Sequence, residues 1–121
     1  MDGREFEYFV GNIFKAFGFD VVKTRSTNDQ GADLIVSKDD LKIVIQTKRY
    51  NDKNRVGNRA VQEITAAIKY YGADKGMVIT TSEFTKSAIE LAEANGIKLI
   101  DGKELKRIID NLNSIYHILL T

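Results

Sequence analysis

Residues 31 to 50, GADLIVSKDDLKIVIQTKRY, decide the fold of this chain. Two apolar runs, at residues 32–37 and 41–48, flank a polar turn at residues 38–40, and this pattern predicts an antiparallel hairpin of two buried strands. The second strand does not end in core residues but in polar and basic ones, namely Gln46, Lys48, Arg49 and Tyr50. This polar ending indicates that one end of the hairpin has a role besides packing in the core.

Strand geometry predicts which side chains meet at that end. Side chains two residues apart share a face of a strand, so Gln46 and Lys48 are expected to point the same way. Pairing about the turn places Asp33 opposite Gln46, within about one residue. A carboxylate, an amide oxygen and an ammonium group are therefore expected to converge at one end of a sheet.

These groups suit metal-assisted hydrolysis of a phosphodiester. Mg²⁺ prefers hard oxygen ligands and keeps several waters, so Asp33, the Gln46 side-chain oxygen and the Thr47 carbonyl are candidate ligands. A metal-bound water is easier to deprotonate, and Lys48 would position it or stabilise charge on the phosphate. Because glutamine is neutral and a weaker ligand than glutamate, we expect substrate phosphate or a further carboxylate to help hold the metal.

The first predicted helix offers that further carboxylate. Apolar residues at helical spacing between residues 3 and 17 predict an amphipathic helix, which Glu5 and Glu7 interrupt. Glu7 borders the apolar stripe and is the better candidate for the site. Glu5 is interpreted as an acid that favours the positive end of the helix dipole.

The rest of the chain predicts an α/β domain. Further helices are expected at residues 56–71, 84–94 and 102–112, and further strands at 19–25, 75–81 and 97–100. The resulting order, αβββαβαβα, implies a mixed sheet of about five strands with helices on both faces. With 121 residues and no visible linker or repeat, we expect one domain spanning residues 1–121.

Charge is concentrated in one segment, although the whole chain carries only +1. Residues 42 to 59 contain six basic residues and one acid. Four of the basic side chains are candidate contacts to a phosphate backbone, namely Arg49, Lys53, Arg55 and Arg59. The alternative is a solvated loop without a partner.

Composition excludes several classes of protein. With 43% hydrophobic and 29% charged residues the chain is typical of a soluble globular protein. No apolar run approaches the roughly 20 residues of a membrane span, and the charged N-terminus does not read as a signal peptide, so a cytoplasmic location is expected. The chain has no cysteine, which excludes disulfides and thiolate-bound zinc.

Four blocks of the sequence resemble the Mrr-type catalytic domain of the PD-(D/E)xK nuclease superfamily. They follow the family's order and spacing over residues 3 to 105, nearly the whole chain. The blocks are GREFEYFVGNIFKAFGFDV, DQGADLIV, VIQTKRY and AVQEITAAIKYYGADKGMVITTSEFTKSAIELAEANGIKLIDGKEL.

The resemblance implies a restriction endonuclease-like fold and assigns roles by position. Asp33 takes the place of the acidic metal ligand, Gln46 the (D/E) position and Lys48 that of the catalytic lysine. Glu7 falls where Mrr-type domains and the related archaeal Holliday-junction resolvases place a first-helix glutamate. Ala32 stands where the motif name has proline, which this branch often lacks.

The resemblance also implies an activity, a metal-dependent DNA endonuclease that uses Mg²⁺, with Mn²⁺ as a substitute. Mrr-like restriction enzymes carry a separate DNA-recognition domain, for which this chain has no room. We therefore expect a stand-alone, resolvase-like enzyme, a homodimer, or a catalytic chain that acts with a separate specificity subunit. The alternative is a non-catalytic DNA-binding or assembly module that keeps the fold, and RNA is a further candidate substrate.

Three residues are secondary candidates for the site. Arg25 and Ser26 precede the metal aspartate in a loop that loosely matches resolvase loops, and Gln62 begins the helix after the hairpin. His117, in the apolar tail IYHILL, is interpreted as a surface or interface residue in a candidate dimer contact.

Overall fold

The computed structural model describes residues 2–24, 31–50 and 54–120, and in the last helix it describes side chains as far as residue 112. In chain order the elements are α1 (Gly3–Ala16), β1 (Asp20–Lys23), β2 (Leu34–Lys38), β3 (Leu41–Lys48), β4 (Arg55–Val56), α2 (Asn58–Tyr71), β5 (Lys75–Thr80), β6 (Glu83–Phe84), α3 (Lys86–Asn95), β7 (Lys98–Ile100) and α4 (Gly102–Leu120). Five of the strands form one sheet, in the order β1-β2-β3-β5-β7.

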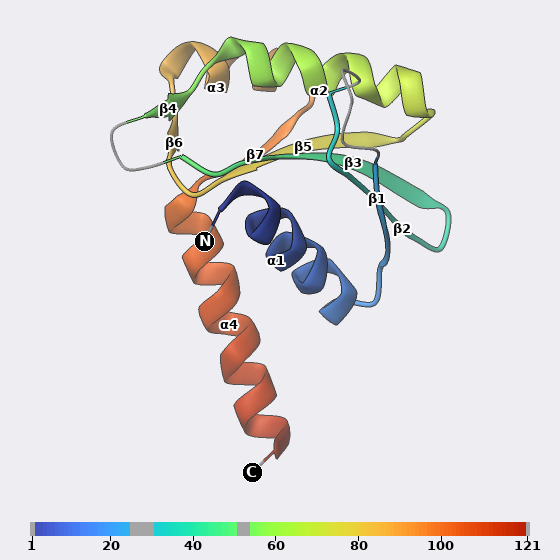
Figure 1. Cartoon of the computed structure of the whole chain (residues 1–121), viewed down its shortest axis with the longest axis vertical. Helices are drawn as coiled ribbons and strands as arrows, with labels where there is room; N and C mark the ends of the chain where they lie inside the picture. Colours follow the sequence, from blue (N-terminus) through green and yellow to red (C-terminus); the bar gives the residue numbers. More distant parts are fainter. Residues whose placement is uncertain (1, 25–30, 51–53, 121) are drawn as a thin grey trace.

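The sheet is mixed, as the sequence predicted (Figure 1). β2 runs antiparallel to both β1 and β3, whereas β3, β5 and β7 run parallel to one another. β3 is the central strand, and it joins the antiparallel half of the sheet to the parallel half. The restriction endonuclease-like α/β fold is thus confirmed.

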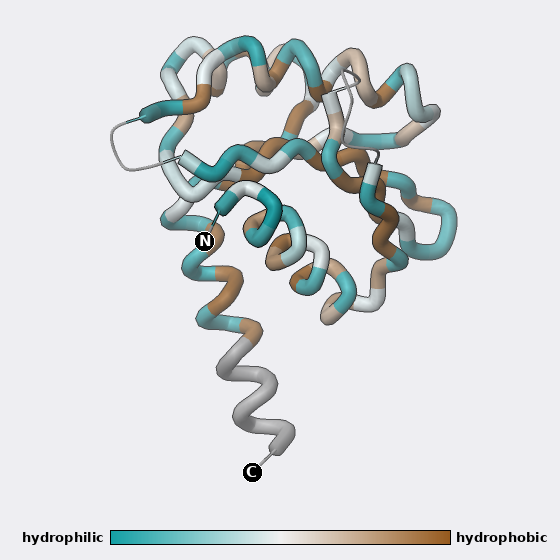
Figure 2. The backbone as a smooth tube through the Cα atoms, viewed as in Figure 1, coloured by the Kyte–Doolittle hydropathy of each residue, from teal (hydrophilic) through white to brown (hydrophobic). Residues whose placement is uncertain are grey.

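Helices cover both faces of the sheet, also as predicted. Figure 1 shows α2 and α3 along one face and α1 on the other, with α4 running away from the sheet on that second side. Alternate side chains of β3 supply the two cores: Val44 packs in the cluster under α2 and α3, and Ile43 and Ile45 pack in the cluster with α1 and the start of α4. Figure 2 shows hydrophobic residues along the strands of the sheet.

The hairpin has the predicted register. Leu34 pairs with Ile45 and Lys38 with Leu41, so Asp33 stands opposite Gln46 one step beyond the ladder. The turn is made by Asp39 and Asp40, and Asp39 has a φ of 55°. Aspartate tolerates this left-handed conformation better than most residues, so a two-residue turn closes the hairpin without glycine.

Capping residues explain where two helices begin. At α1, the Asp2 carboxylate accepts from the Glu5 N–H at 2.8 Å, and the Glu5 carboxylate accepts from the Asp2 N–H at 3.4 Å. This capping box gives Glu5 a structural role at the helix terminus. At α3, the Thr85 hydroxyl accepts from the Ala88 N–H, so the helix begins at Lys86 and not at residue 84 as predicted.

The predicted element order lacked two short strands. β4 and β6 pair in parallel as a separate two-stranded sheet, Arg55 with Glu83 and Val56 with Phe84. As a result α2 begins at Asn58 and not at residue 56. Two residues are too few for an alternating pattern to be visible in the sequence.

The last helix is longer than predicted, since α4 extends to Leu120 and not to residue 112. Within the described part of the chain, none of the helices has the length and apolar character needed to span a bilayer.

Candidate active site

Asp33 lies just before β2 and is fixed against the end of β3. Its backbone N–H donates to the Ile45 carbonyl at 2.8 Å. Its carboxylate oxygen Oδ2 accepts from the Thr47 N–H at 2.7 Å and from the Thr47 hydroxyl at 3.1 Å. At the end of the β2–β3 ladder, the Asp33 carboxylate thus accepts the hydrogen bond that a backbone carbonyl would otherwise accept. This hydrogen bond holds the carboxylate in one position.

The β1 side of the same residue is held by Thr24. The Thr24 hydroxyl donates to the Ala32 carbonyl at 2.7 Å and is 3.1 Å from the Asp33 carbonyl. The Thr24 N–H donates to the Asp33 carbonyl at 3.0 Å. Asp33 is therefore anchored through its backbone to β1 and through its side chain to β3.

Gln46 is buried, with 4% of its surface exposed, and its amide has one defined orientation. The Nε2 group donates to the Gly31 carbonyl at 2.9 Å and to Glu63 Oε1 at 3.4 Å. Both neighbours are acceptors, so the nitrogen must face them and the oxygen must face the other way. Among the described residues, Oε1 has no hydrogen-bond donor although it is buried.

The donors at this end of the sheet fit a hard cation. An unpaired buried oxygen costs about 1–3 kcal/mol, so its presence calls for a missing partner. The Gln46 oxygen, the Asp33 carboxylate and the Thr47 carbonyl are the oxygen ligands that Mg²⁺ prefers, and Mg²⁺ takes few ligands from protein. No cluster of three or more Asp, Glu, His or Cys side chains suited to a metal occurs in the described residues, so a metal here would use the amide oxygen.

Glu7 lies on α1 and reaches toward the sheet. Its carboxylate is 3.8 Å from the Lys23 ammonium on β1, and 19% of its side chain is exposed. Burial raises the pKa of the Glu7 carboxyl above its ordinary value, the charge of Asp33 raises it further, and Lys23 and Arg4 oppose the shift. The influence of Asp33 indicates that the two carboxylates share one end of the sheet.

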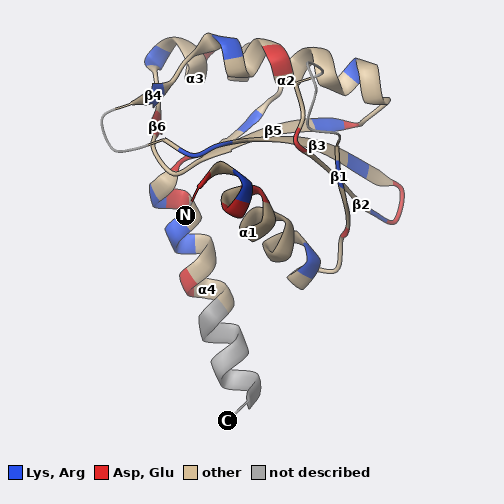
Figure 3. Ribbon diagram, in the orientation of Figure 1, with Lys and Arg blue, Asp and Glu red and all other residues tan. Residues whose placement is uncertain are grey.

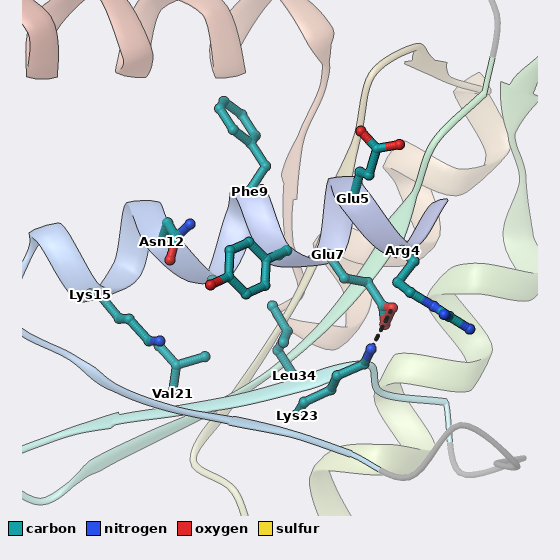
Figure 4. A pocket seen from close by; sticks show the side chains of 11 residues that line it. Arg4, Glu5, Glu7, Phe9, Asn12, Lys15, Val21, Lys23 and Leu34 are labelled. Carbon is teal, nitrogen blue, oxygen red and sulfur yellow. Dashed lines mark ion pairs between the residues drawn. The ribbon is translucent and has the colours of Figure 1, made fainter. Parts of the chain in front are cut away.

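A cavity of about 670 Å³ lies beside Glu7, between α1 and the first two strands. Figure 4 shows Lys23 reaching across to Glu7, with Arg4 next to them and Leu34 below. The cavity explains how the Glu7 side chain can be partly desolvated and still open to small molecules such as water.

We predict that replacing Glu7 by glutamine changes how stability depends on pH. The pKa of Glu7 is higher in the folded protein, so the folded state binds this proton more tightly than the unfolded state does. The resulting contribution to stability is present below the ordinary pKa and is lost as the pH rises through the raised value. The free energy of unfolding of Glu7→Gln relative to wild type should therefore increase between pH of about 4 and 7. Urea unfolding of both proteins at the two pH values measures it, and a difference independent of pH would contradict the shift.

Lys48 ends β3, and its backbone is fixed by the end of β5. The Lys48 carbonyl accepts from the Thr80 hydroxyl at 2.6 Å and from the Thr81 N–H at 3.3 Å. Thr80 is fully buried and its oxygen also accepts from the Ser82 N–H. The half-buried Lys48 side chain therefore starts from a rigid backbone position.

The segment after Lys48 is anchored at two further points. The Thr81 hydroxyl accepts from the Tyr50 N–H at 3.0 Å and donates to the Tyr50 carbonyl at 2.8 Å. The Ser82 hydroxyl donates to the Asn54 carbonyl. The sequence analysis did not predict these hydrogen bonds. The pattern that could have indicated them is the run of three hydroxyl residues, Thr80 to Ser82, at the end of the strand beside β3.

Basic residues line the path from β3 through β4 into α2 (Figure 3). Arg49 is exposed, Arg55 is 3.7 Å from Glu83, and the Arg59 guanidinium is 3.6 Å from the Glu63 carboxylate. Exposed ion pairs are worth about 0–1 kcal/mol, so a phosphate can displace these carboxylates.

Of the remaining sequence candidates, the structure describes Gln62. Gln62 is exposed on α2, and the α2 residue that contacts Gln46 is its neighbour Glu63. Sequence reasoning did not identify Glu63, because only tertiary packing decides which helix position faces the strand end. Arg25, Ser26 and Lys53 lie outside the described residues.

Comparison with known proteins identifies the family of this chain. The family model of the Mrr catalytic domain, a restriction endonuclease, matches residues 1–109. The chain belongs to the Mrr family of restriction endonucleases. The type IV methyl-directed restriction enzyme EcoKMrr of Escherichia coli (strain K12) is 32% identical to this Mrr-family chain over 113 residues. That match covers 86% of the chain but only 36% of EcoKMrr, so the chain spans about a third of this relative.

Solved structures share the fold of this Mrr-family domain. The DNA modification-dependent restriction endonuclease AspBHI superposes with a TM-score of 0.66 at 18% identity, over 93% of this chain and 35% of that one. The MspJI restriction endonuclease, in complex with a 27-mer oligonucleotide, superposes with a TM-score of 0.67 at 20% identity, over 89% of this chain and 28% of that one.

Proposed function

We propose that this Mrr-family domain is a metal-dependent DNA endonuclease that uses Mg²⁺, with Mn²⁺ as a substitute. The observation that carries the proposal is the buried Gln46 oxygen, which has no donor among the described residues. In the hairpin register Gln46 stands opposite Asp33, whose carboxylate is held by Thr47. Oxygen atoms held in this way, at the end of a strand that continues into a basic segment, suit a cation that engages a phosphate.

Each residue has a part in the proposed hydrolysis. Asp33, Gln46 and the Thr47 carbonyl would hold the ion, which when bound lowers the pKa of water and polarises the phosphate. Lys48 would stabilise negative charge on the phosphate under attack. Glu7, with its raised pKa, is a stronger base than an ordinary carboxylate and would support proton removal from water at this site.

The proposed substrate is DNA bound through its backbone. Arg49, Arg55 and Arg59 would contact phosphates, which position a nucleic acid without reading its sequence. EcoKMrr is methyl-directed and AspBHI depends on DNA modification, so modified duplex DNA is a candidate substrate beside branched DNA. Because the chain spans about a third of EcoKMrr, we propose one nuclease domain that takes its specificity from a separate part or subunit, or from a homodimer.

The test is a cleavage assay with several DNA structures. The purified chain is incubated with supercoiled, linear, methylated and four-way-junction DNA, with Mg²⁺, Mn²⁺ or EDTA. We expect metal-dependent nicking or cutting of at least one substrate, and none with the Asp33→Ala, Lys48→Ala double variant. A full set of intact substrates, or full cutting by the double variant, would refute the proposal.

The same protein preparations distinguish the alternative of a non-catalytic DNA-binding or assembly module. Such a module would bind DNA with a strong dependence on salt, without metal, and would keep that binding when Asp33 is replaced. An RNA duplex and an RNA single strand in the assay decide between the two nucleic acids.

A further inference from the structure

We propose that Glu63 is a positioning residue for Gln46. The pair requires one amide and one carboxylate, and we propose that the two groups can trade places between positions 46 and 63. The inference rests on the proposed function, because it concerns the orientation of the oxygen offered to a metal. It also explains why glutamine stands at a position where a carboxylate would bind a cation more strongly.

The contacts of Glu63 divide its carboxylate between two partners. Oε1 accepts from Gln46 Nε2 at 3.4 Å, and Oε2 is 3.6 Å from Arg59 Nε. The first contact faces the buried amide, whereas the Arg59 side chain is 90% exposed. The contact with Gln46 is thus the less exposed of the two, and charge has the larger effect there.

The backbone of Glu63 also fixes the second acceptor of the amide. A Cβ at Gly31 would lie 2.3 Å from the Glu63 carbonyl oxygen, so only glycine allows this close approach. The Gly31 carbonyl accepts from Gln46 Nε2 at 2.9 Å. Both acceptors therefore come from one contact, between α2 and the residue Gly31 that precedes β2, and together they hold Oε1 in the opposite direction.

This arrangement favours an amide at position 46 over a carboxylate. A glutamate there would place a negative oxygen against the Gly31 carbonyl and the Glu63 carboxylate, with no proton to donate to either. Like charges in contact inside a protein are strongly unfavourable. If Glu63 becomes glutamine at the same time, its amide can donate to the new carboxylate, and the pair regains its hydrogen bond with the roles reversed.

The experiment is a double-mutant cycle on the full chain with two measurements besides cleavage. We compare wild type, Gln46→Glu, Glu63→Gln, the double variant and Glu63→Ala. For each protein we measure thermal unfolding without metal, and Mn²⁺ binding by calorimetry. We expect Gln46→Glu to lower the melting temperature by about 5 °C or more. The double variant should recover the part of that loss that comes from Glu63, while the Gly31 carbonyl still faces an acceptor in both variants. Glu63→Ala should weaken Mn²⁺ binding by about 10-fold or more, because the Gly31 carbonyl is then the only one of the two acceptors left to orient the amide.

Glu83→Gln is the matched control, since Glu83 is also paired with an arginine, at 3.7 Å, but lies away from Gln46. It should leave both the melting temperature and Mn²⁺ binding close to wild type. Equal melting temperatures for Gln46→Glu and the double variant, or wild-type Mn²⁺ binding by Glu63→Ala, would overturn the inference.

Failure of the proposed function gives a different result. If wild type binds no Mn²⁺ but the double variant still recovers the melting temperature, the pairing stands and the metal-dependent activity does not. If Mn²⁺ binds and drives cleavage but the cycle shows no coupling, the activity stands and the pairing is refuted.

Discussion

An Asp33→Asn variant is expected to lose DNA cleavage by a factor on the order of 10³ while it keeps its fold. The new side chain is neutral, so it binds a cation more weakly than a carboxylate does and cannot act as a base. Its carbonyl oxygen can still accept from the Thr47 N–H, which in wild type donates to the carboxylate at 2.7 Å. Cleavage rates and circular dichroism of the two proteins, measured under the same conditions, check both parts of the prediction.

The matched control is Asp40→Asn, the same change in the exposed turn at the other end of the hairpin. This variant should cleave DNA at the wild-type rate. If Asp33→Asn also cleaves at that rate, or if both variants lose activity equally, Asp33 does not have the proposed role.

The second large effect is expected on stability. Gly31→Ala should lower the free energy of unfolding by about 2–5 kcal/mol, from a strained backbone and from overlap with α2. Gly31 has a φ of +80°, and an added Cβ would lie 2.3 Å from the Glu63 carbonyl oxygen. The Gly31 carbonyl also orients Gln46, so the Gly31→Ala protein that is still folded should bind Mn²⁺ more weakly than wild type. Urea unfolding and calorimetry measure the two effects.

Gly72→Ala separates the two causes. Gly72 has a similar φ of +64° at the end of α2, but nothing lies within 4 Å of an added Cβ. This control should cost only about 1 kcal/mol, the usual penalty for a side chain in the left-handed region. Equal losses in the two variants would show that α2 can move away from Gly31 at little cost.

Much of the fold follows from local patterns in the sequence. The hairpin register was predictable because apolar residues alternate between two buried faces, and a slip of one residue would expose the whole set. The same register brought Asp33 to Gln46, as the ladder from Leu34 and Ile45 confirms. The assignment of catalytic roles to these residues remains a proposal.

The rest depends on contacts between distant parts of the chain. Glu63 faces Gln46 only because α2 packs on β3 and its backbone meets Gly31, which precedes β2, and the helical period of α2 does not specify that position. The hydroxyls of Thr80, Thr81 and Ser82 anchor the basic segment because β5 runs parallel to β3, so that both strands end together. The starts of α2 and α3 were misjudged because β4 and β6 are two residues each.

The hydrogen bonds of Asp33 bear on how this family diverges. Its carboxylate accepts from the backbone and hydroxyl of Thr47, so the sheet itself benefits from an acceptor at this position. A relative without nuclease activity would still gain stability from an aspartate or an asparagine at this position. Gln46 is also tied into the fold, because its Nε2 group donates to the Gly31 carbonyl and to the Glu63 carboxylate. Folding alone can therefore explain why a relative keeps either residue, so their presence does not by itself show that the relative is active.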